Sequence, residues 1–122
     1  MWSNCLFVAL GGGLGAVGRY LLSLIAAPWS FPVMTLLTNF LGAVVIGAVA
    51  QAAGQLPMSK SAVLFLKTGL CGGFTTFSTF SLETVELLEQ GRWAAGGGYI
   101  LASVGLCLAG VLLGRALVWK IF

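Results

Sequence analysis

The chain has 122 residues, and its charged side chains are limited to six Lys or Arg and three acidic residues. This 7% charged fraction is far below the roughly 25% of soluble globular domains, and 59% of the residues are hydrophobic. Glycine is abundant at 18 residues, which is typical of membrane helices that pack closely. The composition therefore excludes an independent water-soluble domain. A net charge of +3 without a basic cluster excludes nucleic acid as a partner.

Four apolar segments follow one another along the chain, at about 20 residues per membrane span. We predict a single domain, residues 1–122, with transmembrane helices at residues 4–27, 33–53, 62–89 and 94–119. Connectors are expected at the proline-containing residues 28–32, at the polar residues 54–61 and at residues 90–93, with a tail at 120–122. Tryptophans at the segment ends are typical of an aromatic belt at the membrane surface: Trp2, Trp29, Trp93 and Trp119.

The orientation of these segments is only weakly specified. Clear loop and tail positions place Lys60 and Lys120 on one side and Arg92 on the other, so the positive-inside rule gives a slight preference for cytoplasmic termini. A chain with so weak a bias can insert in both orientations, which would allow an antiparallel dimer.

The third segment contains an unusual polar stretch, residues 69–81 (GLCGGFTTFSTFS). Gly72 and Gly73 predict a weak point in the helix, and hydroxyl residues follow directly. Irregular backbone at membrane depth is tolerated only where it is buried in protein or lines a cavity. A break here would free carbonyl oxygens, which are good ligands for a hard cation such as Na⁺. The alternative is a helix-crossing point whose hydroxyls bond to their own backbone.

Phe74, Phe77 and Phe80 recur at every third position of this stretch, so we expect them near one face of the helix. Core packing or lipid contact accounts for such a row in most membrane helices. The alternative uses the ring quadrupole, because the electropositive edge of a phenyl ring can face an anion. Phenyl edges among hydroxyl donors would hold a small anion without a fixed positive charge.

Polar residues at helical spacing mark the second and fourth segments. Asn39 lies about six residues into its span, where a polar side chain is costly without a partner. It either links two helices or presents its amide donors to a ligand. Glycine pairs at G-x-x-x-G spacing predict close packing of the first and fourth segments. The polar stripes are Thr35, Thr38, Asn39 and Gly42, and Tyr99, Ser103 and Cys107; the glycine pairs are Gly11–Gly15 and Gly110–Gly114.

Charged and reactive side chains offer few sites for chemistry. Arg19 is the one charge inside the first segment, and it either extends to the interface or attracts anions in an aqueous vestibule. The three glutamates, Glu83, Glu86 and Glu89, end the third segment, where solvent exposure is expected. Histidine is absent, and three isolated cysteines indicate packing rather than a disulfide or zinc site. An enzyme is not expected.

Three motifs are specific enough to indicate a family. Residues 12–20 read GGLGAVGRY, residues 38–42 read TNFLG, and residues 72–80 read GGFTTFSTF. In order, they resemble the first-, second- and third-helix motifs of the Fluc (CrcB) fluoride channels, and the third is the closest match. The likeness extends over all four segments.

The resemblance implies an all-α integral membrane protein with four transmembrane helices, the third broken at mid-membrane. It implies an antiparallel, dual-topology homodimer in the bacterial inner plasma membrane. Such a dimer exports fluoride passively through two pathways between its subunits and holds a structural Na⁺ at its centre. Carried over by motif, backbone carbonyls of Gly72 and Thr75 would hold Na⁺, and Arg19 would lie near the vestibule. The fluoride pathway would comprise Asn39, Phe77, Phe80, Ser78, Thr79, Tyr99 and Ser103, while Cys107 stands where another hydroxyl is expected.

Two other functions remain open at this point. A small four-helix, dual-topology multidrug or cation transporter would need a membrane-embedded Glu in its first span, and residues 4–27 contain none. A structural membrane subunit would use the glycine and hydroxyl stripes for packing alone. Fluoride flux from liposomes separates the three functions.

Overall fold

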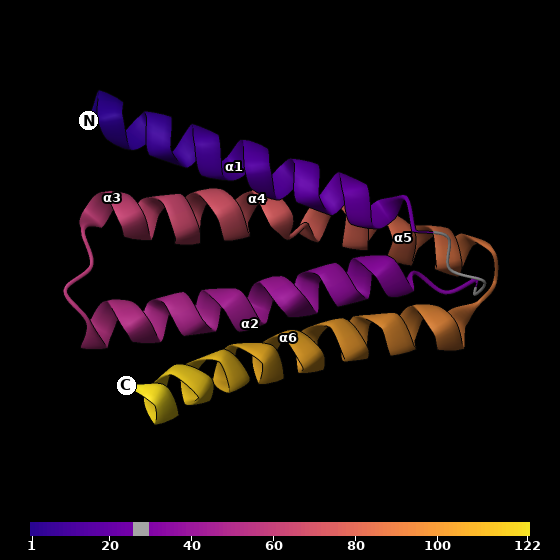
Figure 1. Ribbon diagram of the computed structural model, residues 1–122. Helices are drawn as coiled ribbons and strands as arrows, with labels where there is room; N and C mark the ends of the chain where they lie inside the picture. The colour runs from indigo at the N-terminus through magenta and orange to yellow at the C-terminus, as the bar shows by residue number, and fades with distance from the viewer. Residues whose placement is uncertain (26–29) are drawn as a thin grey trace.

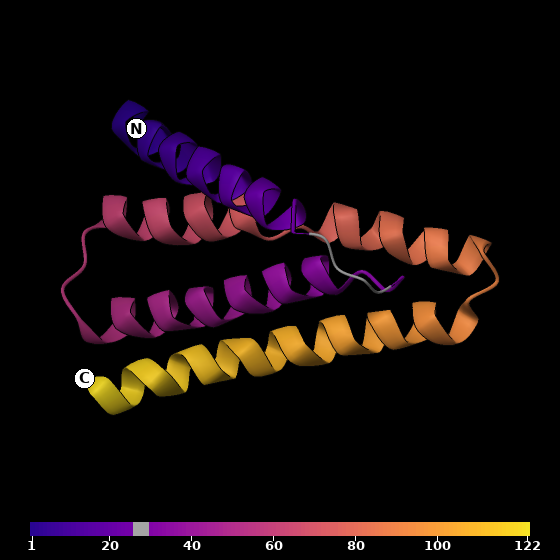
Figure 2. The same cartoon turned by 45° about the vertical axis from the view of Figure 1, so that its right-hand side comes forward.

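The computed structural model describes residues 1–25 and 30–122, which form four helical spans that run back and forth along a common direction (Figure 1). Both chain termini lie at the same end, which is clear in the rotated view as well (Figure 2). The elements are α1 (Trp2–Ser23), α2 (Val33–Gln55), α3 (Lys60–Val63), the π-helix η1 (Leu64–Cys71), α4 (Gly72–Phe74), α5 (Phe77–Glu89) and α6 (Trp93–Ile121). The predicted all-helical fold class is confirmed.

Helices α1, α2 and α6 are each long and apolar enough to cross a membrane, with 22, 23 and 29 residues. Only 11% of the apolar stretch of α1 and 17% of that of α6 are buried within the subunit. Such extensive apolar surface is stable against lipid or another subunit and not against water. The chain is therefore an integral membrane protein.

The helix boundaries differ from the predicted ones by a few residues. Helix α1 ends at Ser23, and residues 26–29, which include Trp29 and the first part of the expected connector, lie outside the described residues. Helix α2 continues to Gln55. Helix α6 ends at Ile121, so it includes two of the three residues assigned to a tail; Lys120 in its last turn suits the negative end of the helix dipole.

Glycines set the distance between the helices. Helix α1 packs on η1 and α4, and α2 packs most extensively on α6. A Cβ atom added to Gly15 would meet Leu70 O and would lie 2.7 Å from Phe74 N. A Cβ atom added to Gly114 would meet Val44 O on α2. The structure thus confirms that the two G-x-x-x-G pairs mediate close packing.

The third span consists of α3, η1, α4 and α5. It is interrupted at Thr75 and Thr76, which both adopt extended backbone angles (φ −84°, ψ 155° and φ −148°, ψ 117°). We predicted the weak point at Gly72 and Gly73, but these residues are helical and belong to α4. The break falls later because the backbone of Thr76 is held by a side chain of another helix, as described below. The π-helix that precedes it was not predicted; such segments are often found at functional sites.

The break separates Phe74 from the other two phenylalanines, so the predicted shared helix face is wrong for Phe74 and holds for Phe77 and Phe80, whose ring centroids lie 5.4 Å apart on α5. Phe74 packs beside α1, where a Cβ atom on Gly18 would lie 3.6 Å from its ring. Phe77 is 79% exposed on the subunit surface. Phe80 is buried and its ring centroid lies 5.1 Å from that of Tyr99.

Candidate functional site

The side chain of Asn39 binds the extended backbone at the break in the third span. Its Nδ2 donates to Thr76 O at 3.1 Å, and Thr76 N donates back to Asn39 Oδ1 at 2.8 Å. The hydroxyl of Thr76 in turn accepts from Thr79 N at 3.1 Å and caps helix α5. The interhelical role considered for Asn39 is therefore present. The primary amide carries a second Nδ2 hydrogen, for which the described residues provide no recorded acceptor.

The break leaves backbone carbonyls without their usual helical donors. Because Thr76 N–H donates to Asn39, it is not available to Gly72 O four residues earlier. Gly73 O instead accepts from Arg19 Nε at 3.3 Å. The hydroxyl of Thr75 donates to Cys71 O at 2.8 Å, which is the local backbone bonding considered from the sequence.

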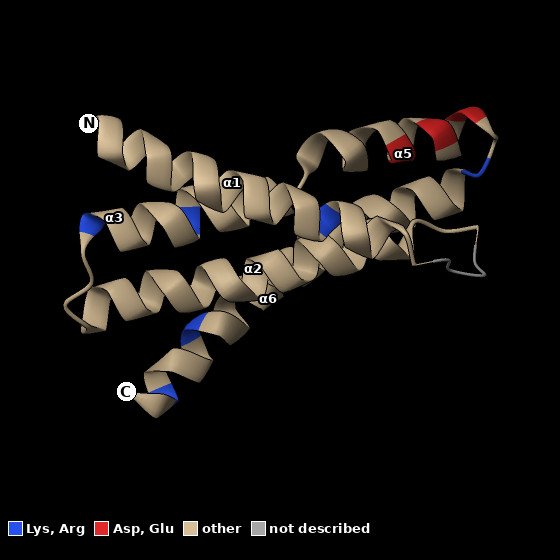
Figure 3. Ribbon diagram, turned by 45° about the horizontal axis from the view of Figure 1, so that its top comes forward, with Lys and Arg blue, Asp and Glu red and all other residues tan. Residues whose placement is uncertain are grey.

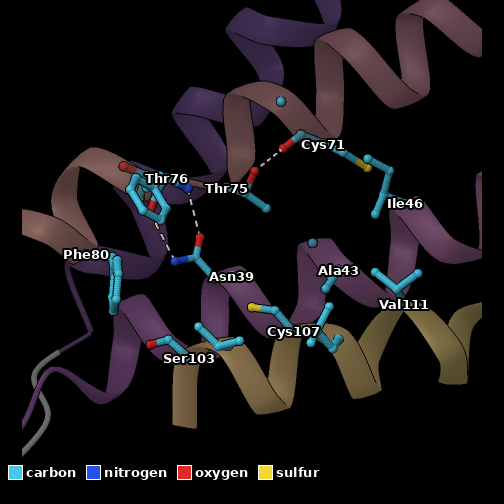
Figure 4. Close-up of a pocket in the computed structure, with 15 residues that line it drawn as sticks. Asn39, Ala43, Ile46, Cys71, Thr75, Thr76, Phe80, Ser103, Cys107 and Val111 are labelled. Carbon is cyan, nitrogen blue, oxygen red and sulfur yellow. Dashed lines mark hydrogen bonds between the residues drawn. The ribbon is translucent and has the colours of Figure 1, made fainter. Parts of the chain in front are cut away.

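A cavity of about 420 Å³ lies beside this break, between α2, the third span and α6 (Figure 4). Its walls are mainly apolar, with Ile46 and Val111 at one end. Ser103 Oγ is buried and has no hydrogen-bond partner within residues 1–25 and 30–122. Six of the predicted site residues line the cavity: Asn39, Gly72, Thr75, Phe77, Phe80 and Ser103. Cys107 lines it as well.

A second, smaller pocket of about 70 Å³ lies against α1 and the start of α5. Arg19 and Thr79 line it together with Thr35 and Thr38, so the structure places these two predicted residues apart from the main cavity. Ser78 is exposed and Tyr99 is fully buried, and neither lines one of these two pockets. The predicted pathway residues are thus divided between the main cavity, the smaller pocket and positions outside both. These sets are, in order, Asn39, Phe77, Phe80 and Ser103; Thr79; and Ser78 and Tyr99.

Glu83 differs from its predicted solvent exposure. It is half-buried, and its carboxylate accepts from Tyr99 OH at 2.9 Å and from Thr35 Oγ1 at 3.1 Å. These donors come from α6 and α2, so the carboxylate ties three spans together. Glu86 and Glu89 are exposed, as expected. Tyr99 OH is committed to this carboxylate, a contact that the spacing along α6 does not reveal.

The site offers different groups to ions of opposite charge. Backbone oxygens are its ligands for a cation, and neutral hydrogen-bond donors are its partners for an anion. Within the described part of the chain, no group of three His, Cys, Asp or Glu side chains is placed to hold a metal ion. A hard cation there would be bound by carbonyl oxygens.

Comparison with known proteins assigns the family. Residues 6–115 match the family described as "CrcB-like protein, Camphor Resistance (CrcB)". A protein of Roseiflexus sp. is 48% identical over 115 residues, covering 91% of this chain and 93% of the relative. One of Ruminiclostridium cellulolyticum is 45% identical over 118 residues, covering 93% and 91%. One of Shewanella frigidimarina is 47% identical over 122 residues, covering 97% and 98%.

Each of these relatives is named "Fluoride-specific ion channel FluC". The name denotes an ion channel and no catalysed reaction, in agreement with the prediction that the chain is not an enzyme. The match extends over most of the chain and of each relative, and it includes the three motifs singled out in the sequence. The chain therefore belongs to the CrcB family.

Proposed function

We propose that the chain forms a fluoride-selective channel that lets fluoride leave the cell passively. The observation that carries this proposal is the rigid backbone break at Thr76, held by Asn39 beside a cavity with an unpartnered Ser103 hydroxyl. The relatives named as fluoride channels support the choice of ion.

Fluoride is small and strongly hydrated, so a pathway must replace its lost water with hydrogen-bond donors. Two groups serve as hydrogen-bond donors, namely the second Nδ2 hydrogen of Asn39 and the Ser103 hydroxyl. The ring edges of Phe77 and Phe80 add electropositive surface. None of them carries a full charge, and weak binding lets the ion leave as well as enter. Arg19 attracts anions to the adjoining pocket, with Thr79 beside it. Ser78, which is exposed, belongs to the approach to this route, whereas Tyr99 is fully buried with its hydroxyl on Glu83 and lines neither pocket.

The functional unit is an antiparallel homodimer with two pathways. Phe77 is 79% exposed in the subunit although it lines the cavity, so a second copy is needed to enclose the route. The two ends of the subunit also differ in charge (Figure 3). Antiparallel copies place the basic end of one subunit beside the acidic end of the other, and parallel copies place like charges together. By their positions in the helices, Lys60, Lys67, Arg115 and Lys120 lie toward the end that holds the termini, and Glu83, Glu86, Glu89 and Arg92 lie toward the other end.

A Na⁺ ion at the centre of this dimer suits the donor set. Gly72 O lacks its usual donor, and a Cβ atom added to Gly72 would approach only Lys67 O, at 3.9 Å, so the backbone is open to a second subunit. Carbonyls of Gly72 and Thr75 from both subunits would hold the ion. Na⁺ would offset repulsion between anions in the two pathways. The apolar helices and weak charge bias fit a bacterial inner membrane in which both orientations occur.

Flux from liposomes tests the function. We expect the purified protein to release fluoride from fluoride-loaded liposomes and to pass negligible chloride. Phe80→Ile should reduce fluoride flux strongly, because it replaces a ring edge in the cavity. Leu82→Ile is the matched control on the same helix, since Leu82 is 59% exposed and does not line the cavity. Well-folded dimers without fluoride flux would exclude the channel.

Topology and the cation have separate tests. A tag at the C-terminus should be found on both sides of the membrane in comparable amounts, and a single orientation would contradict the antiparallel dimer. Anomalous diffraction with a heavier monovalent cation should show one ion on the two-fold axis. A dimer without such an ion would refute the Na⁺ site.

A further inference from the structure

Two of the cysteines line the cavity described above, and they differ in their accessibility. Cys71 is 3% exposed, and its sulfur points toward Ile46 at one end of the cavity (Figure 4). Cys107 is half-buried on α6, one helical turn beyond Ser103, and its side chain lies on the side of Asn39 (Figure 4). Cys107 is thus the more accessible of the two thiols.

The cavity beside Cys107 has a second feature of a ligand site. Ser103 is 7% exposed, and its Oγ has no partner among the described residues. A buried hydroxyl without a partner is costly, and it indicates that a ligand or water occupies the space next to it. Ser103 and Cys107 lie on the same face of α6, so a molecule bonded to the thiol occupies that space too.

We propose that Cys107 is a binding site for soft, thiol-seeking metal cations, and that loading this site blocks the channel. Thiolate sulfur selects soft metals, whereas hydroxyl, amide and carbonyl oxygens bind them poorly. With a methylmercury cation the thiol S–H bond breaks, a Hg–S bond forms and the proton passes to water, without any change in oxidation state. The product is neutral and apolar, so the cavity walls retain it.

Block follows from the position of the sulfur. Asn39, Ser103 and Cys107 line one cavity, and the Cys107 sulfur lies on the side of Asn39, so an adduct on it would occupy space that fluoride needs beside the two neutral donors. This consequence rests on the proposed fluoride channel, whereas binding of the metal to Cys107 does not.

Single-cysteine variants test the proposal with methylmercury chloride as the probe. The variant with Cys5→Ser and Cys71→Ser retains only Cys107, and we expect one mercury adduct per chain by intact mass. Its fluoride flux should fall about tenfold or more relative to the same variant untreated, because an occluded pathway does not conduct. Excess free thiol should remove the adduct and restore the flux. Cys107→Ser in the otherwise native chain should keep its own untreated flux under methylmercury.

The outcomes separate this proposal from the proposed function. If the Cys107-only variant takes up mercury and its flux is unchanged, or if it takes up no mercury while folded, the proposal is wrong. If Cys107→Ser is still blocked, the site lies at Cys5 or Cys71 and the assignment is overturned. If untreated native protein conducts no fluoride, the proposed function fails, and the mass measurement alone then decides whether Cys107 binds the metal.

Discussion

Replacement of Asn39 tests whether one side chain both fixes the backbone break and serves the ion. Asn39→Leu removes both hydrogen-bond partners of the Thr76 backbone. Thr76 N–H loses its acceptor, Asn39 Oδ1 at 2.8 Å, and Thr76 O loses its donor, Asn39 Nδ2 at 3.1 Å. A fully buried polar group left without a partner costs about 1–3 kcal/mol, and because Thr76 is only half-buried, we expect its two groups together to cost about 1–3 kcal/mol. Asn39→Asp keeps the acceptor for Thr76 N–H, but its second carboxylate oxygen faces Thr76 O in place of the donor, so repulsion and desolvation of the charge add to the lost bond.

In conduction, the Asp variant should show the larger loss, because its carboxylate repels the anion. A carboxylate about 4 Å from an anion at an effective dielectric constant of about 20 repels it by about 4 kcal/mol. Because each 1.4 kcal/mol is about a tenfold change, occupancy of the cavity by fluoride should fall roughly a thousandfold in Asn39→Asp. We therefore expect the Asp variant to be no more stable than the Leu variant and to be silent in flux.

The assays are denaturation of the purified dimer and fluoride efflux from liposomes. Gln51→Leu is the matched control, because Gln51 is an amide on the same helix whose bond, 2.7 Å to Gln55 Oε1, stays within α2. That pair is worth about 0.2–0.5 kcal/mol. Wild-type stability of Asn39→Leu would refute the structural role of the amide. Wild-type flux of Asn39→Asp would refute its place in the pathway.

Three further substitutions test the packing of the subunit. Gly15→Val should destabilise the protein by about 1–3 kcal/mol or more, because its side chain meets the backbone of η1; Gly13→Ala, with nothing within 4 Å, should stay within about 0.5 kcal/mol in the same thermal unfolding assay. Tyr99→Phe removes a hydrogen bond to a carboxylate and should cost about 1.5–3 kcal/mol by denaturation; an unchanged midpoint would show that this bond contributes nothing. Phe80→Ala should cost about 3–5 kcal/mol through loss of its buried ring contacts, and the same thermal unfolding assay measures it; an unchanged midpoint would contradict this packing role.

The spans and the glycine positions at which helices approach closely follow from local sequence, and the position of the break does not. Apolar length predicts a helix wherever it occurs, and the Gly11–Gly15 spacing predicts close approach whatever the partner. The break depends on Asn39, which lies 37 residues from Thr76, and no local pattern links the two. A threonine cap before an apolar run was a usable signal for the start of α5 at Thr76.

The surroundings of Glu83 show the same limit. The position of Glu83 near the end of a span predicts that its side chain is exposed to solvent. Its spacing to Glu86 gives no reason to expect different environments for the two carboxylates. The difference comes from Thr35 and Tyr99, which lie on two other helices and direct their hydroxyls at one carboxylate only. Side-chain roles that depend on three helices meeting are set by tertiary packing, so the sequence identifies the residues and not their partners.

Asn39 shows why packing and ion handling need not be alternative roles in this cavity. A donor that is free to rotate would lose conformational entropy on binding an ion, whereas two bonds to Thr76 fix the amide before any ion arrives. Its remaining N–H is then held at the cavity wall, and the fixed dipole does not have to reorganise around the anion. In the proposed channel, such a site would bind fluoride through rigidity rather than charge. Its selectivity should accordingly change more when the two hydrogen bonds between Asn39 and Thr76 are lost than when the salt concentration is raised. Salt screens charges, and these donors are neutral.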